Sequence, residues 1–208
     1  MSEVITPTRF CLIRHAVVLP EYLALLYGQM DVPICPFRLS QDGGRYAALG
    51  KILPKDAKWL ISPLGRTKAT AEAIMAAGYG DTPLEIEPGL IEQNFGLWQG
   101  LPMSELIRRP RQHPFWPVGG DEAPPMGESF NQMRDRVGIT MDRLVNANPG
   151  KTIVAVSHGG AIRAAAAHAL GLSSYQALTL SVDNLSITRI ERSGHGWRVT
   201  SLNEQISI

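Results

Sequence analysis

The chain has 208 residues, with 20 basic and 19 acidic side chains and a formal net charge of +1. This length suits one domain with a sizeable core, so a single domain over residues 1–208 is expected. The balanced charge argues against a nucleic-acid or membrane partner, and the absence of a signal peptide or long apolar stretch favours a cytoplasmic protein.

Short apolar runs that end in loop signals predict buried strands at residues 10–13, 59–61, 84–86 and 153–156. Between them, apolar positions at three- and four-residue spacing predict helices over residues 45–53, 67–77, 130–145 and 161–170. Two later alternating runs, 185–190 and 197–202, flank a glycine-rich turn and predict an antiparallel hairpin. Strands that alternate with helices predict an α/β fold around a largely parallel sheet.

Residues 107–127 interrupt this alternation. The segment is rich in proline and glycine and carries the aromatic residues Phe115 and Trp116. Long loops in compact domains often serve as lids or binding loops, so we interpret the segment as an inserted, lid-like region. A passive surface loop is the alternative.

Charged and histidine side chains follow three of the predicted strands. Arg14 and His15 come directly after the first strand, and His158 follows the strand at 153–156. Arg66 begins the helix that follows the strand at 59–61. In parallel sheets, ligands bind beyond the carboxyl ends of the strands, so these side chains are expected to share one site.

These residue types suit phosphoryl transfer. Gly159 and Gly160 remove side chains at the start of a helix, where backbone N–H groups can approach an anion. Arginine supplies fixed donors to phosphate oxygens, and imidazole can act as a nucleophile. A carboxyl group such as that of Glu92 can protonate the leaving oxygen and later accept a proton from water.

The motifs together resemble those of the histidine phosphatase superfamily, in its phosphoglycerate-mutase-like branch. The main ones are Leu12-Ile13-Arg14-His15, Ser62-Pro63-Leu64 with Arg66-Thr67, Glu92 with Phe95-Gly96 and Trp98, and Ser157-His158-Gly159-Gly160 with Ile162-Arg163. Tyr27-Gly28 with Asp31-Val32-Pro33, Leu39-Ser40 with Gly43, and Gly127-Glu128-Ser129 resemble secondary motifs. The resemblance implies a three-layer α/β/α fold with a largely parallel central sheet and an antiparallel C-terminal edge.

The resemblance also implies roles for particular residues. His15 would be the phosphorylated nucleophile, and Glu92 the proton donor. The phosphate pocket and further substrate contacts would come from Arg14, Arg66, His158, the backbone of Gly159, Tyr27, Glu128 and Ser129. For Ser129, capping of the helix that starts at 130 is an equally good interpretation. No cofactor is expected, and no spacing among the histidines and cysteines resembles a metal site.

The sequence departs from the family pattern at the edge of the pocket. Ala16 stands where glycine is usual after the Arg-His pair, and its Cβ is expected to crowd the pocket or to forbid a positive φ. Tyr46 and Gln99 replace a common glutamine and a frequent glutamate. Arg163, one turn into its helix, is open to a structural interpretation.

A metal-independent phosphatase acting on a small phosphorylated metabolite is the favoured function. Phosphoglycerate mutase is less favoured, since the chain ends soon after the predicted hairpin. An α-ribazole phosphatase is a narrower option, raised by residues 27–33. A catalytically silent, phosphate-binding regulatory protein is the alternative from another class, and a homodimer is possible.

Overall fold

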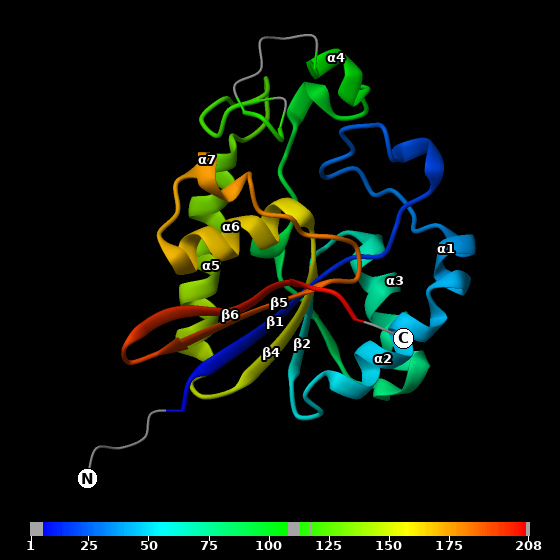
Figure 1. The fold of residues 1–208 in the computed structure, drawn as a ribbon, viewed down its shortest axis with the longest axis vertical. Helices are drawn as coiled ribbons and strands as arrows, with labels where there is room; N and C mark the ends of the chain where they lie inside the picture. Colours follow the sequence, from blue (N-terminus) through cyan, green and yellow to red (C-terminus); the bar gives the residue numbers. More distant parts are fainter. Residues whose placement is uncertain (1–5, 108–112, 117, 207–208) are drawn as a thin grey trace.

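A six-stranded sheet forms the centre of the computed structural model, which describes residues 6–107, 113–116 and 118–206. The strands lie in the order β3-β2-β4-β1-β5-β6 (Figure 1). Their bounds are β1 Thr8–Arg14, β2 Lys58–Ile61, β3 Leu84–Ile86, β4 Thr152–Ser157, β5 Ile187–Ser193 and β6 Gly196–Glu204.

The directions of the strands confirm the predicted sheet. β1, β2, β3 and β4 are parallel to one another, whereas β5 runs antiparallel to β1 and pairs with β6 in an antiparallel hairpin. Parallel neighbours need a crossover connection, and helices provide it on both sides of the sheet. The carboxyl ends of four neighbouring strands therefore meet at one edge.

Helices cover both faces of the sheet, which gives the expected three layers (Figure 1). The helices of the described residues are α1 (Pro36–Gln41), α2 (Gly43–Ile52), α3 (Gly65–Ile74), α4 (Met103–Ile107), α5 (Phe130–Ala147), α6 (Gly159–Leu170) and α7 (Ser174–Ala177). Short helical turns lie at Pro20–Tyr22, Met75–Tyr79, Pro88–Leu90 and Gly96–Trp98. α5, α6 and α7 pack on one face, and α2 and α3 pack on the other.

The central strand β4 shows why its sequence is apolar throughout. Ile153 and Ala155 point into the cluster beneath α5 and α6, and Val154 and Val156 point into the cluster beneath α2 and α3. All four side chains are fully buried. Successive side chains of a strand alternate between faces, so a sheet covered on both sides requires apolar residues at every position.

Three helices, α1, α4 and α7, were not expected from the sequence, although α1 and α7 carry a recognisable start signal. Pro36 occupies the first turn of α1, and Ser173 forms a capping box with Gln176 at the start of α7. The predicted start of the hairpin at residue 185 was wrong by two residues. Leu185 has a φ of 62°, which is not an extended conformation, and β5 begins at Ile187.

Part of the predicted lid-like region lies outside the described residues, namely 108–112 and 117. Among the described part of that region, α4 ends at Ile107, and 113–116 and 118–127 form turns, bends and irregular backbone. His113 ties this segment to α7, because its Nε2 lies 2.9 Å from the carbonyl oxygen of Tyr175. Its action as a lid stays a prediction, as does the organisation of the whole chain as one domain.

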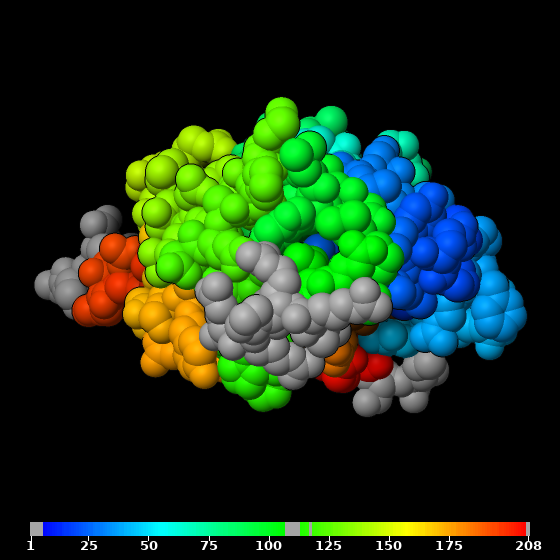
Figure 2. All heavy atoms as spheres, turned by 90° about the horizontal axis from the view of Figure 1, so that it is seen from above, coloured from blue at the N-terminus to red at the C-terminus, as the bar shows by residue number. Residues whose placement is uncertain are grey.

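Seen from above, the segment around residues 95–107 lies beside residues 20–30 (Figure 2). Leu25 and Pro102 form a bridge between them, and Leu26 donates a backbone hydrogen bond to Leu101. These two segments stand over the carboxyl edge of the sheet. Within the described ranges, no helix has both the length and the apolar character that crossing a bilayer would require.

The buried face of α5 should carry much of the stability. Met141 is fully buried in the cluster beneath α5 and α6, whereas Ile139 on the same helix is 71% exposed. Met141→Ala is expected to lower the free energy of unfolding by about 2–5 kcal/mol, because it leaves a cavity. Ile139→Ala should change it by less than about 0.5 kcal/mol. Urea denaturation measures both, and equal effects would contradict the assigned packing.

Candidate active site

The residues expected to carry the chemistry gather at the carboxyl edge of the sheet. Arg14 ends β1 and His15 follows it, while His158 follows β4. Arg66 lies in the first turn of α3, just beyond β2, and Glu92 lies in the connection that leaves β3. The rings of the two histidines meet edge to face, with centroids 5.2 Å apart.

One hydrogen bond identifies the free nitrogen of His15. The ring is buried, with 1% exposed, and its Nδ1 lies 2.7 Å from the carbonyl oxygen of Ala16. A carbonyl oxygen can only accept, so Nδ1 donates and carries the ring proton. Nε2 is left with a lone pair, which makes it the nucleophilic nitrogen of the ring.

Burial and neighbouring charge favour the neutral form of both histidines. Burial lowers the pKa of His15 well below its ordinary value of 6.5, and the guanidinium groups of Arg66 and Arg14 lower it further. Burial also lowers the pKa of His158 well below 6.5, followed by the effects of Arg66, His15 and Arg14. Only a neutral imidazole can attack phosphorus, so the surroundings of His15 suit a nucleophile.

Three nitrogen atoms in this cluster are buried and have no hydrogen-bond partner among the described residues. They are Nε of Arg14, Nε of Arg66 and Nδ1 of His158. The other ring nitrogen of His158, Nε2, lies 2.6 Å from the hydroxyl oxygen of Ser62. An unsatisfied buried polar group costs about 1–3 kcal/mol, so such groups are rare and call for a partner. The oxygens of a bound anion would supply one.

Main-chain carbonyl groups hold the two arginines without neutralising them. Arg66 donates from Nη1 to Met30 at 2.7 Å and from Nη2 to Gly28 at 2.6 Å. Arg14 donates from Nη1 to Val182 at 2.7 Å. A carbonyl oxygen orients a guanidinium group but carries no net charge. Both positive charges therefore remain available to an anion.

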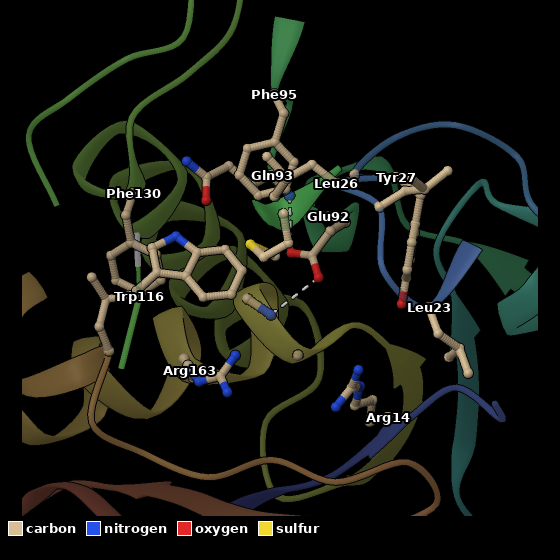
Figure 3. Close-up of a pocket in the computed structure, with 16 residues that line it drawn as sticks. Arg14, Leu23, Leu26, Tyr27, Glu92, Gln93, Phe95, Trp116, Phe130 and Arg163 are labelled. Carbon is tan, nitrogen blue, oxygen red and sulfur yellow. Dashed lines mark hydrogen bonds between the residues drawn. The ribbon is translucent and has the colours of Figure 1, made fainter. Parts of the chain in front are cut away.

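Arg163 is a third cation that lines the same pocket, and it also makes a structural contact. Its Nε donates to the carbonyl of Leu180 at 2.7 Å. Its guanidinium group and that of Arg14 point into the pocket from opposite sides (Figure 3). They converge on the space that Gly159 leaves open: a Cβ there would lie 3.3 Å from Arg163 Nη1 and 3.5 Å from Arg14 Nε.

The Glu92 carboxylate is fixed by backbone donors. Its Oε1 accepts from Gln93 N–H at 2.9 Å, and its Oε2 accepts from Gly160 N–H at 3.1 Å (Figure 3). The Glu92 carbonyl accepts from the side chain of Gln29 at 2.8 Å. Arg136 donates to carbonyl oxygens of the loop that precedes this residue. The Glu92 carboxylate is therefore held beside the arginine cluster, on a loop that these hydrogen bonds stabilise.

The other predicted substrate contacts divide into two pairs. Tyr27 and Gly159 line the pocket, and the Tyr27 ring centroid lies 6.5 Å from that of His15. Glu128 and Ser129 are not among the residues that line it. Whether any of the four touches substrate stays a prediction.

Glu128 and Ser129 have evident supporting contacts. The Glu128 carboxylate pairs with Arg136 at 2.7 Å and accepts from Asn94 N–H at 3.0 Å. Ser129 caps α5 in a capping box with Gln132. The capping interpretation offered by the sequence is confirmed for Ser129, and Glu128 braces the loop that carries the Glu92 carboxylate.

Sequence reasoning missed the residues that hold the backbone around His15. Thr70 Oγ1 accepts from Ala16 N–H at 2.9 Å, and Asn184 Nδ2 donates to the His15 carbonyl at 2.7 Å. Both come from elements far away in the sequence. In the sequence, the indication of such a role was a polar residue, Asn184, beside an apolar run.

The expectation that the Cβ of Ala16 would crowd the pocket was wrong, whereas the absence of a positive φ agrees with the restriction that a Cβ imposes. Ala16 does not have a positive φ, and its side chain is buried in the cluster beneath α2 and α3, which also contains Tyr46. Gln99 accepts from the backbone N–H of Gln29 at 2.8 Å. These departures from the family pattern are accommodated in packing and loop contacts.

A cavity of about 250 Å³ opens over this cluster, and Arg14, Glu92 and Arg163 point into it (Figure 3). His15, Arg66 and His158 do not line it, because they are almost fully buried. In the described part of the chain, no three His, Cys, Asp or Glu side chains gather as a metal ion would need.

Comparison with known proteins agrees with this arrangement. The family model described as histidine phosphatase superfamily (branch 1) matches residues 10–205. The solved structure of mycobacterial glucosyl-3-phosphoglycerate phosphatase Rv2419c superposes with a TM-score of 0.80 at 24% identity, covering 96% of this chain and all of that one. At this identity, the structural match shows the fold alone.

Three curated relatives carry different names. The uncharacterized phosphatase PhoE of Bacillus subtilis is 29% identical over 199 residues, covering 94% of each chain. The probable phosphoglycerate mutase GpmB of Yersinia pestis is 28% identical over 189 residues, covering 89% of this chain and 86% of the relative. The bifunctional protein Rv2228c of Mycobacterium tuberculosis is 30% identical over 189 residues, and this chain spans about half its length.

Nuclear magnetic resonance can test the state of His15. The ring should remain neutral and protonated at Nδ1 as the pH falls through 6.5, because burial and two guanidinium groups lower its pKa. The ¹⁵N shifts of the ring nitrogens report both the charge and the tautomer. A ring that becomes charged at or above 6.5 would contradict the assignment, and so would a proton on Nε2.

Gly160 should be essential to the position of Glu92. A Cβ at residue 160 would overlap Glu92 Oε1, so Gly160→Ala is expected to displace the carboxylate and lower turnover about 100-fold. The loss should be greater for alkyl phosphates than for 4-nitrophenyl phosphate, whose leaving group hardly needs a proton. Gly43→Ala is the control, since nothing lies within 4 Å of that Cβ. Equal activity in both variants would refute the assigned role.

Proposed function

Because the chain belongs to the histidine phosphatase superfamily, we propose that it hydrolyses phosphate monoesters through a phosphohistidine on His15. One observation carries the proposal. Three buried nitrogen atoms, from Arg14, Arg66 and His158, lack partners among the described residues, and the centroid of the His158 ring lies 5.2 Å from that of His15. A tetrahedral dianion would satisfy all three and balance the positive charge.

In the first step, His15 Nε2 attacks phosphorus in line with the ester oxygen. A P–N bond forms, and the P–O bond to the leaving group breaks. Glu92 gives its proton to the departing oxygen, so the product leaves as an alcohol. The charge on the peripheral oxygens is stabilised by Arg14, Arg66 and His158, and Arg163 supplies a further cation at the same end of the pocket.

In the second step, water attacks the phosphorus of phosphohistidine. Glu92, now ionised, takes the proton from the water, the P–N bond breaks, and the electron pair returns to Nε2. Phosphate then leaves, and the enzyme regains its starting state. The cycle needs no metal ion or cofactor, because side chains supply the nucleophile, the acid and the cations.

A mutase uses the same first step but returns the phosphoryl group to a sugar acid instead of water. The names of the relatives include both activities, PhoE as a phosphatase and GpmB as a probable mutase. We favour hydrolysis, since the wall of the pocket offers few partners for the hydroxyl and carboxyl groups of such an acceptor. The expected cytoplasmic location and homodimer stay predictions.

His15→Ala should abolish phosphate release from 4-nitrophenyl phosphate in the presence of EDTA. Wild-type enzyme quenched during turnover should gain the mass of one phosphoryl group on the peptide that contains His15, and the variant should not. His195→Ala, in the exposed turn between β5 and β6, is the matched control and should retain full activity. Unchanged hydrolysis by the His15→Ala variant would refute the proposal. Transfer of phosphate to glycerate in place of water would favour the mutase.

A further inference from the structure

Away from Arg14 and Arg163, most of the described side chains that line the pocket are apolar. Eight apolar side chains contribute to it, from four separate stretches of the chain: Leu23, Leu25, Leu26, Phe95, Met103, Trp116, Phe130 and Leu178. The charged groups lie at the other end, around Gly159 and Gly160. The pocket is therefore divided into a cationic end and a hydrophobic end.

The hydrophobic end is a packed surface and not a set of loose side chains. Leu26 and Phe95 are buried in a small cluster of their own, against which Trp116 and Met103 pack. The rings of Phe95 and Trp116 lie 6.3 Å apart at an interplanar angle of 30°. Trp116 also packs against the main cluster that contains Phe130. Such a surface holds its shape before a ligand arrives.

Among the residues that the structure describes, few polar groups at this end could serve the leaving group. The side-chain amide nitrogen of Gln93 already donates to the carbonyl of Glu128 at 2.9 Å. The other described polar side chains of the lining are Arg14, Tyr27, Glu92 and Arg163, and all of these except Tyr27 belong to the phosphoryl end. Figure 3 shows Trp116 and Phe130 on one side of the cavity and Leu23 on the other, with Glu92 between them and Arg14 and Arg163 below.

We infer that the natural substrate is a phosphate monoester with an apolar, ring-sized leaving group. The inference rests on the proposed phosphatase function and narrows its substrate class. A ring would gain from leaving water for the Trp116 and Phe130 wall. The hydroxyl groups of a polyol would lose water there without gaining partners.

Two primary alkyl esters test the idea, because they differ little in the reactivity of the bond that breaks. The wild-type protein is compared on 2-phenylethyl phosphate and on glycerol 3-phosphate. The expected kcat/KM is about 10- to 100-fold higher for the phenylethyl ester, which is the scale for burying one ring. Equal values, or a preference for the glycerol ester, would overturn the inference.

Variants test whether the apolar side chains of the pocket cause the preference for the phenylethyl ester. Trp116→Ala should reduce the ratio of the two kcat/KM values by roughly tenfold, mainly by loss of activity on the phenylethyl ester. Leu23→Ser should reduce it severalfold, and this side chain is 59% exposed, so folding is not at stake. Phe115→Ala is the matched control, since Phe115 neighbours Trp116 but is 71% exposed and does not line the pocket. An unchanged ratio in both wall variants would refute the assignment.

The same assays separate this inference from the proposed function. If phosphohistidine forms on His15 and glycerol 3-phosphate is the better substrate, the substrate class is wrong and the phosphatase proposal stands. If neither ester is hydrolysed and no phosphohistidine forms, both proposals fail. Arg163→Lys should lower activity on the two esters by a similar factor, because that side chain serves the phosphoryl end.

Discussion

The site depends on concentrating positive charge without neutralising it. Arg14, Arg66 and Arg163 are oriented by main-chain carbonyl oxygens, and two of these carbonyls come from the single segment that connects α7 to β5. If carboxylates held the guanidinium groups, ion pairs within the protein would neutralise the positive charges of the arginines. Burial and this positive charge both lower the pKa of the two histidines and so favour their neutral form, and the three unpaired nitrogen atoms can donate to a bound anion.

The layers of the fold and the location of the site could be predicted because both depend on local patterns. Apolar runs at strand length and helical periodicity fixed most elements, and strand ends placed His15, His158 and Arg66 on one edge. The bracing residues could not be predicted, since Thr70 and Asn184 reach His15 and its neighbour from elements remote in the sequence. Only the assembled sheet brings them together.

The directions of the Ala16 and Arg163 side chains could not be predicted from the sequence, for one physical reason. The direction of a side chain near a strand end depends on the backbone that follows, and a motif does not specify it. The Cβ of Ala16 turns into the core beneath α2 and α3, whereas Arg163 turns from the first turns of α6 into the cavity. The pocket's division into cationic and apolar ends likewise arises from loops far apart in the chain.

A crystal structure with orthovanadate tests the central claim most directly. The account predicts vanadium bonded to Nε2 of His15, with Arg14 Nε, Arg66 Nε and His158 Nδ1 each within about 3.2 Å of a vanadate oxygen. Vanadate bound elsewhere in the cavity, with these three nitrogen atoms still unpaired, would contradict it.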